Sequence, residues 1–246
     1  MADRNRRIFI MAGNHEWADG LRNFRRVVLD RPTGMIGGWS IGNHTSYFCI
    51  KLPHGWWMCC VDPGNEMSQD MDEAQITYFK KIVEEQTKPT DRFILAVHEP
   101  DWIKNSLHGF ALFKNLALFR QNILGERLRL TLAGDLHYYR RMEESTGETT
   151  EQIEAPYPYY ITARRQLVVA GHGGAFSHPT YVPSSEGGIR LGEPHVEGGP
   201  HYHDVTNYPT PAQSKATYNA KWKDGFSFGK NYGYGSILAM SECFIK

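Results

Sequence analysis

Three short segments of the chain each place side chains of the metal-ligand type directly after an apolar run. Asn14 and His15 stand in "AGNHEW", His98 in "AVHEP", and Asp135 and His137 in "AGDLHYY". Imidazole nitrogens, an amide oxygen and a carboxylate form the mixed ligand set that suits manganese, iron or zinc. If the three segments meet in space, these residues have the chemistry that two-metal hydrolases use.

Each segment taken alone also has a structural explanation. The stretch from Gly13 to His15 would serve as a polar turn with an incidental histidine, and His98 as a hydrogen-bonded residue at a strand end. A second "GNH", Gly42 to His44, precedes the strand-like "TSYFCIKLP", so we interpret that copy as a loop. The metal-site hypothesis therefore depends on the three segments together.

Buried strands are expected to position these residues. Ile8 to Met11, "RFILAV" and "RLRLTLA" are apolar runs typical of strands that are buried on both faces of an α/β sheet. In such sheets, ligands bind beyond the carboxyl ends of the strands. We therefore predict that Asn14, His98, Asp135 and His137 converge at one edge of a sheet. A fourth run, "RQLVVA", is a further strand of the same kind.

Other segments carry ordinary signals of secondary structure. "DGLRNFRRVVLD" predicts a helix capped by Asp19, and "DMDEAQITYFKKIVEEQ" a helix with a capping box of Asp70 and Glu73. "TSYFCIKLP" and "WWMCCVD" predict a hairpin, and "LFKNLALFRQNIL" an apolar-rich helix. From Pro179 to about Pro211 glycine, proline, histidine and tyrosine dominate, which indicates a long loop or flap.

Composition narrows the class of protein. The 246 residues include 27 lysines and arginines and 27 aspartates and glutamates, with no basic stripe, so nucleic-acid binding is not indicated. No signal segment and no apolar run long enough to cross a bilayer is recognisable, which predicts a soluble, cytoplasmic chain. Cys49, Cys59 and Cys60 lie in strand-like segments, and we expect buried free thiols there.

The three segments together resemble the calcineurin-like metallophosphoesterases. The motifs of that family are, in order, Asp-x-His, Gly-Asp, Gly-Asn-His-Asp/Glu, a lone histidine after a strand, and Gly-His-x-His; the last three match "AGNHEW", "AVHEP" and "AGDLHYY". Asp135 replaces the first histidine of the final motif, and an aspartate still ligates a hard or borderline metal. "GGWSIGNHTSYF", "LPHGWW", "AGDLHYYRR" and "GGAFSHPT" look like a bacterial and plant subgroup, and the resemblance runs from about Arg7 to Pro211.

The resemblance implies an α/β fold, a four-layer α-β-β-α sandwich that here lacks its first strands. It implies a phosphoesterase domain over residues 1–180, and a segment 181–246 that leads to a membrane part in longer relatives. The localisation would then be cytoplasmic, or membrane-associated in a longer form. The Asp-x-His and Gly-Asp motifs have no match before Gly13, so we expect either a truncated sequence or a true variant.

The resemblance also implies an activity, namely metal-dependent hydrolysis of a phosphate ester by a hydroxide held between two metals. One metal would keep Asn14, His98 and Asp135, and the other only His137, so about one ion or fewer per chain is expected. His15 would be the general acid. The alternative is a non-catalytic remnant or binding module with an incomplete metal site.

Several neighbouring residues have open roles. Glu16 would either orient His15 or cap the following helix. Arg140 and Arg141 would either meet the substrate phosphate or belong to a solvated face. Asp19 or Asp62 are candidates to replace the missing bridging carboxylate, and His172 is a candidate for the edge of the site.

Overall fold

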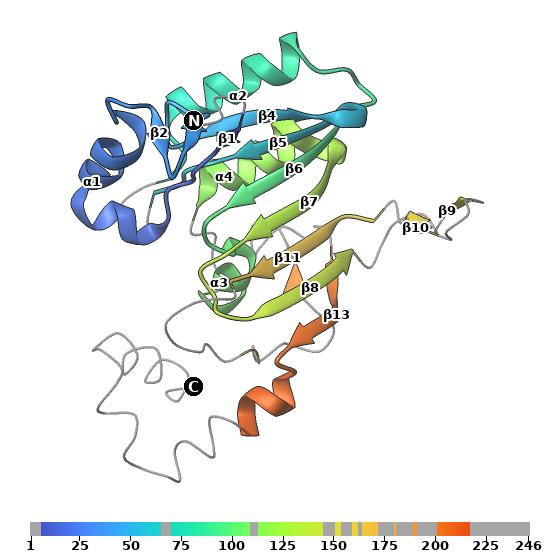
Figure 1. Ribbon diagram of the computed structural model, residues 1–246. Helices are drawn as coiled ribbons and strands as arrows, with labels where there is room; N and C mark the ends of the chain where they lie inside the picture. Colours follow the sequence, from blue (N-terminus) through green and yellow to red (C-terminus); the bar gives the residue numbers. More distant parts are fainter. Residues whose placement is uncertain are drawn as a thin grey trace, which may run out of the picture.

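The computed structural model describes residues 6–64, 70–108, 113–144, 151–153, 159–161, 164–171, 180, 189–190 and 201–216. Within these ranges eight strands form one mixed sheet in the order β12-β13-β8-β11-β7-β6-β5-β4 (Figure 1). Its strands are β4 (Phe48–Leu52), β5 (Trp56–Cys60), β6 (Arg92–Val97), β7 (Leu128–Ala133), β8 (Tyr139–Glu144), β11 (Gln166–Ala170), β12 (Ile189–Arg190) and β13 (His201–Tyr208). The general α/β class predicted from the sequence is confirmed.

Two smaller sheets and several short helices complete the described structure. One small sheet contains β1 (Arg7–Ile8), β2 (Met35–Ile36) and β3 (Trp39–Ile41). The other small sheet pairs β9 (Glu151–Ile153) with β10 (Tyr159–Ile161). The α-helices are α1 (Arg22–Phe24), α2 (Glu73–Glu85), α3 (Asp101–His108) and α4 (Lys114–Leu118), with a further helical segment at 211–216. Segments of 3₁₀ helix are Asn14–Asp19, Pro53–Gly55 and Gly125–Arg127, and π-helical segments are Arg25–Leu29 and Phe119–Leu124.

The centre of the large sheet is parallel. β5 pairs with β6, β6 with β7 and β7 with β11, all in the same direction, whereas β4 and β8 run antiparallel to their neighbours. β4 and β5 form the predicted hairpin, with Cys49 opposite Cys59. Because the parallel strands share a direction, the loops that follow β5, β6 and β7 all leave from one edge of the sheet.

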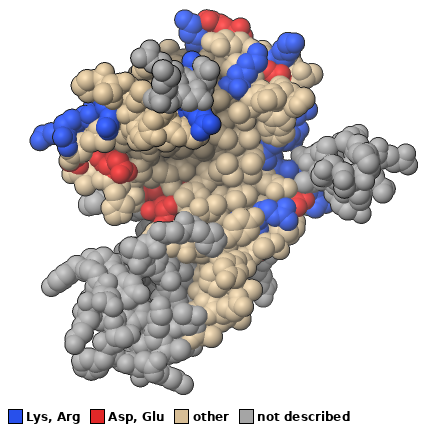
Figure 2. Space-filling view, viewed as in Figure 1, with Lys and Arg blue, Asp and Glu red and all other residues tan. Residues whose placement is uncertain are grey.

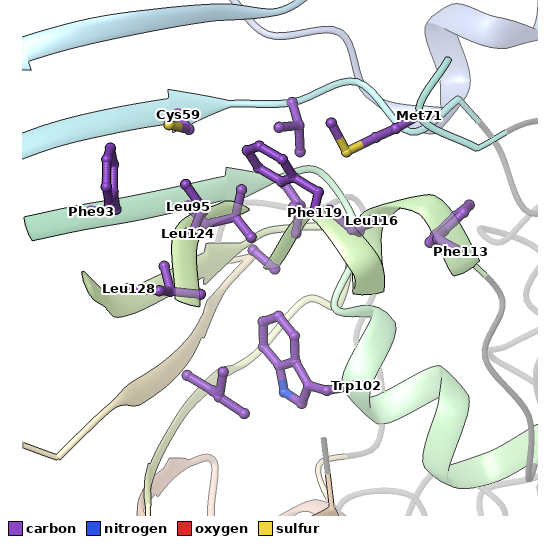
Figure 3. Packing of buried hydrophobic residues seen from close by; sticks show 14 of the residues in the cluster. Cys59, Met71, Phe93, Leu95, Trp102, Phe113, Leu116, Phe119, Leu124 and Leu128 are labelled. Carbon is purple, nitrogen blue, oxygen red and sulfur yellow. The ribbon is translucent and has the colours of Figure 1, made fainter. Parts of the chain in front are cut away.

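The apolar core lies between this sheet and the helices that cover it. Figure 3 shows Leu95 of β6 near Leu116 and Phe119, which lie on α4 and the segment that follows it. Phe79 of α2 packs against Phe119 with ring centroids 5.2 Å apart. Cys49 Sγ and Cys59 Sγ are 3.7 Å apart and unbridged, so the predicted free thiols are confirmed there.

Helix α2 forms where predicted, but its cap differs from the expected one. The N-cap is Asp72, whose carboxylate accepts a hydrogen bond from the Gln75 N–H at 2.8 Å. Asp70 instead accepts hydrogen bonds from the N–H groups of Asn115 and Leu116, at 2.6 and 3.2 Å. The predicted capping box is therefore wrong, because Asp70 caps a different helix, α4, about 45 residues away in the chain.

The first predicted strand is much shorter than the apolar run from Ile8 to Met11. Only β1, Arg7–Ile8, pairs, and its partner is β3 rather than a strand of the large sheet. Phe9 is 37% exposed and its ring packs on Phe48 at a centroid distance of 5.5 Å. The prediction of a strand buried on both faces was wrong, because the apolar side chains here cover a surface between two sheets.

The region predicted as a long loop contains two strands of the large sheet. β12 pairs antiparallel with β13, β13 pairs antiparallel with β8, and Tyr202 is buried against the main core. The loop interpretation was therefore wrong for Ile189–Arg190 and His201–Tyr208, whereas residues 181–188 and 191–200 lie outside the described residues. In the described part of the chain, no helix has the length and apolar character needed to span a bilayer.

Candidate functional site

The loops after β6 and β7 lie side by side and carry three of the predicted ligands, His98, Asp135 and His137. His98 follows β6 directly, and its carbonyl oxygen accepts a hydrogen bond from the Gly134 N–H at 3.1 Å. Asp135, the next residue, has a φ of 61°, a left-handed conformation that aspartate tolerates better than most residues. The backbone thus turns sharply as soon as β7 ends, which places Asp135 at the sheet edge beside His98.

Asn14 reaches this edge from the small sheet. It begins the 3₁₀ segment Asn14–Asp19, and its Nδ2 donates to Asp135 Oδ1 at 3.2 Å, which joins residues 121 positions apart. The predicted proximity of Asn14 and Asp135 is therefore confirmed. His15, the next residue, is exposed. Glu16 Oε2 accepts a hydrogen bond from the Gly13 N–H at 2.8 Å, so Glu16 has the capping role that was one of its two alternatives.

His98 is followed by a buried charge cluster that sequence reasoning missed. His98 Nε2 lies 3.5 Å from Glu99 Oε1, and Glu99 Oε2 lies 2.9 Å from the ammonium of Lys104 on α3. The same ammonium is 3.4 Å from Asp135 Oδ2. The side chains of Glu99, Lys104 and Asp135 are only 1%, 14% and 17% exposed, so these charges interact with little screening by water.

The protonation of Glu99 follows from these contacts. Burial by itself raises the pKa of the Glu99 carboxyl, but the contacts with His98 and Lys104 outweigh it and hold the pKa below its usual range. The carboxylate is therefore charged at neutral pH. A charged carboxylate this deeply buried requires a cation beside it, and Lys104 supplies one.

The convergence of the predicted ligands is partial. His137 lies in the loop that carries Asp135, and its side chain is half-buried. In the described ranges, no group of three or more histidine, cysteine, aspartate or glutamate residues is arranged to hold a metal ion. His98 Nδ1 is buried with no hydrogen-bond partner among the residues described, whereas Nε2 faces Glu99 Oε1. His172 lies outside the described residues.

Asp62 occupies the same sheet edge at the end of β5. The Val61 N–H donates to the Ala96 carbonyl at 3.0 Å, which places Asp62 beside the end of β6. Asp62 Oδ1 accepts a hydrogen bond from Trp17 Nε1 at 2.7 Å, whereas Oδ2 is buried with no hydrogen-bond partner in the described structure. Asp62 thereby fixes the 3₁₀ segment of Asn14 to the large sheet. Asp19, the other candidate carboxylate, is exposed and accepts from Asn23.

The arginines after Asp135 have structural roles. Arg140 is buried, and its guanidinium binds both carboxylate oxygens of Asp204 on β13, at 2.7 and 2.8 Å. The solvated face foreseen as one alternative for Arg140 is therefore wrong, because this side chain is buried. Arg141 donates to Gln166 Oε1 at 3.3 Å.

Burial raises the pKa of Tyr138 to about 12, so its hydroxyl stays protonated at neutral pH.

The second "GNH" differs from the first in what its asparagine contacts. Asn43 is buried, its Oδ1 accepts from the Ile10 N–H at 3.0 Å, and its Nδ2 donates to the Ile10 and Thr45 carbonyls. The loop interpretation of this copy is confirmed, and its role is to hold the chain just before Asn14. Figure 2 shows this face of the molecule hollowed between the part that carries α1 and the strands below it, with acidic side chains near its left border.

Comparison with known proteins gives no further guide to identity. No family model matches the chain, and no curated protein matches it. The motif pattern and the geometry of the site are therefore the grounds on which a function is assigned.

Proposed function

We propose that this chain is a metal-dependent phosphoester hydrolase of the calcineurin-like type, with Asn14, His98, Asp135 and His137 as ligands and His15 as general acid. The observation that carries the proposal is the hydrogen bond of Asn14 to Asp135. Two motifs 121 residues apart in the chain meet there at the carboxyl end of a parallel strand, where α/β sheets bind ligands.

The donors fit a divalent ion such as manganese, iron or zinc. An amide oxygen, a carboxylate and imidazole nitrogens are suitable ligands, and the amide of Asn14 can present either its oxygen or its nitrogen. The buried Nδ1 of His98 supports the proposal, because a buried polar atom without a hydrogen bond calls for a partner such as an ion. When bound, the ion would polarise a phosphoryl oxygen and lower the pKa of a bound water. About one ion per chain, or fewer, remains our expectation.

The chain's own residues would position and protonate the ester. His15 is exposed next to Asn14, so its imidazole is available to give a proton to the leaving oxygen. Glu16 fixes the start of this turn through the Gly13 N–H, and the contact of Trp17 with Asp62 holds the turn on the sheet. Both contacts keep His15 in a defined place relative to Asp135.

The four-layer sandwich and a cytoplasmic location belong to the same proposal. The site lies where the small sheet of β1 meets the large sheet, as expected when ligands come from two stacked sheets. Unbridged thiols such as Cys49 and Cys59 suit a reducing compartment.

One observation favours a second candidate, a non-catalytic binding module of this fold. Lys104 already pairs with both Asp135 and Glu99, and the described acidic and histidine residues include no ready group of three for a metal. A phosphate-bearing ligand could then bind at this edge without being cleaved.

Two measurements on the full chain test the proposal. The first is titration with Mn²⁺, and the second is hydrolysis of p-nitrophenyl phosphate and bis(p-nitrophenyl) phosphate with Mn²⁺ present. We expect His15→Ala to lower turnover by roughly 10²–10⁴-fold without changing Mn²⁺ binding, since a positioned acid contributes about that much. The matched control is His44→Ala, which changes the exposed histidine of the second "GNH".

The outcomes separate the two candidates. Equal rates for wild type, His15→Ala and His44→Ala would refute the role of His15. Binding of Mn²⁺ without turnover of either ester would favour the binding module. The absence of Mn²⁺ binding would refute the metal site itself.

A further inference from the structure

Lys104 occupies a central place in the charge cluster, although no motif marks it. Its backbone N–H donates to the Pro100 carbonyl at 3.3 Å in the first turn of α3, and its side chain extends back toward the sheet edge. Its Nζ lies 2.9 Å from Glu99 Oε2 and 3.4 Å from Asp135 Oδ2. One ammonium therefore bridges the loops that follow β6 and β7.

The two oxygens of Asp135 are both engaged. Asn14 donates to Oδ1 at 3.2 Å, and the ammonium of Lys104 faces Oδ2 at 3.4 Å. A cation that coordinates Oδ2 therefore has to displace Lys104, because two positive charges at one carboxylate oxygen in a poorly screened site repel each other. His98 Nδ1, in contrast, is buried with no hydrogen-bond partner among the described residues, and Nε2 faces Glu99 Oε1 at 3.5 Å.

We propose that Lys104, held by Glu99, is a built-in counter-ion that competes with a divalent cation for Asp135, and that it thereby sets the cation affinity of the site. This inference rests on the proposed function, because it takes the same edge as the cation site. With no cation bound, Lys104 pairs with both carboxylates, balances one of their two negative charges and holds the two loops together. When a cation binds, the ammonium moves away from Asp135 and stays within the site as a positive group suited to a phosphate oxygen.

The test compares Lys104→Gln with wild type in the full chain, by counting free Mn²⁺ with electron paramagnetic resonance. We expect Lys104→Gln to bind Mn²⁺ about tenfold more tightly or better, because it removes a positive charge that competes for Asp135 in a poorly screened site. Without Mn²⁺ the variant should melt at a lower temperature than wild type, since Glu99 loses its cation, and added Mn²⁺ should restore its Tm.

Two control variants and a second test variant make the result specific. Lys104→Arg keeps the charge and should bind Mn²⁺ close to the wild-type level, and Lys114→Gln removes an exposed lysine and should change nothing. Lys104→Met keeps the apolar stem, and it replaces Lys104→Gln if that variant does not fold by circular dichroism.

The result that overturns the inference is Mn²⁺ binding by the folded Lys104 variant that is no tighter than that of wild type. If wild type binds Mn²⁺ and hydrolyses the ester while the variant shows no gain, the role of Lys104 is refuted and the proposed function stands. If neither protein binds Mn²⁺, both are refuted. Tighter binding by the variant that is not seen with Lys104→Arg supports the inference.

Discussion

Replacement of Gly171 by alanine should distort the loop that carries Asp135. A Cβ at this position would lie 2.0 Å from the carbonyl oxygen of Leu136 and 2.7 Å from its carbonyl carbon. Those are backbone atoms of the loop after β7, and the oxygen would have to retreat by about 1.4 Å to reach ordinary contact in a closely packed interior. The Gly171 N–H also donates to the Tyr138 carbonyl at 3.2 Å, so this movement strains a second contact.

The cost can be estimated from this overlap. Forcing an extra methyl group into packed structure typically costs about 1–3 kcal/mol, and a clash with backbone belongs at the upper end. For a chain of this size, about 3 kcal/mol lowers Tm by roughly 6–12 °C. The displaced loop should also weaken the Asn14 to Asp135 contact and hence the binding of Mn²⁺.

Gly134→Ala is the matched control in the same loop. The nearest atom to a Cβ at Gly134 is the His98 carbonyl oxygen at 3.5 Å, which is ordinary contact, so this variant should melt within about 2 °C of wild type. Thermal unfolding followed by circular dichroism measures both shifts. Equal shifts for the two variants, or a Gly171→Ala protein as stable as wild type, would refute the packing argument.

Three further perturbations have defined outcomes. Asp101→Asn should lower the free energy of unfolding in urea by about 3 kcal/mol, because it leaves the guanidinium of Arg120 without its buried bidentate partner, 2.8 and 3.0 Å away. The hydrogen bonds that Asp91 accepts from the Lys88 N–H and from Trp57 lower the pKa of its carboxyl. The stability that the Asp91 carboxylate contributes is therefore complete above the usual pKa of about 3.9, and it is lost as the pH falls through the lowered pKa. Between pH 5 and pH 2, the free energy of unfolding of Asp91→Asn should fall less than that of the wild type. Diamide should slowly oxidise Cys49 and Cys59, which face each other in the β4–β5 hairpin, to a disulfide. Mass spectrometry should then show the loss of two hydrogens and the presence of one crosslinked peptide.

Each of these outcomes has its own control. Asp30→Asn breaks an exposed pair with Arg25 and should cost less than about 1 kcal/mol, so an equal loss for Asp101→Asn would contradict the burial argument. An unchanged pH profile in Asp91→Asn would show that this carboxyl is not responsible. A crosslink that contains Cys60, which neighbours Cys59 in β5 and faces the other side of the sheet, would contradict the assigned register.

The parts of the fold that the sequence predicts are those where periodicity and burial agree. The end of β6, from Leu95 to Val97, is continuously apolar because consecutive residues of this parallel strand are buried on both faces of the sheet. Helix α2 was predictable because its apolar stripe faces the core. Phe9 shows the limit of this reasoning. The sequence of a short apolar run does not distinguish a strand inside a sheet from a segment that covers the surface between two sheets.

The site was predictable as far as motifs define it. Asn14 and Asp135 meet as expected, since each follows a strand in the expected order. Lys104 could not be found, because a single lysine in a helix has no spacing that marks it, and its role depends on the packing of α3 against the sheet edge. Arg140 was misassigned for a related reason, since its partner Asp204 lies 64 residues later in a segment with little apolar pattern.

The position of β13 has a consequence for how the chain matures on the ribosome. The strands from β4 to β7 can pair in the order in which they are synthesised, because only helices and loops separate them. In contrast, one edge of β8 has no partner until β13 is synthesised some 60 residues later. Until Tyr208 has left the exit tunnel, one edge of β8 is open and the guanidinium of Arg140 lacks its carboxylate. A nascent chain stalled before that point is therefore the species most exposed to aggregation and to capture by chaperones.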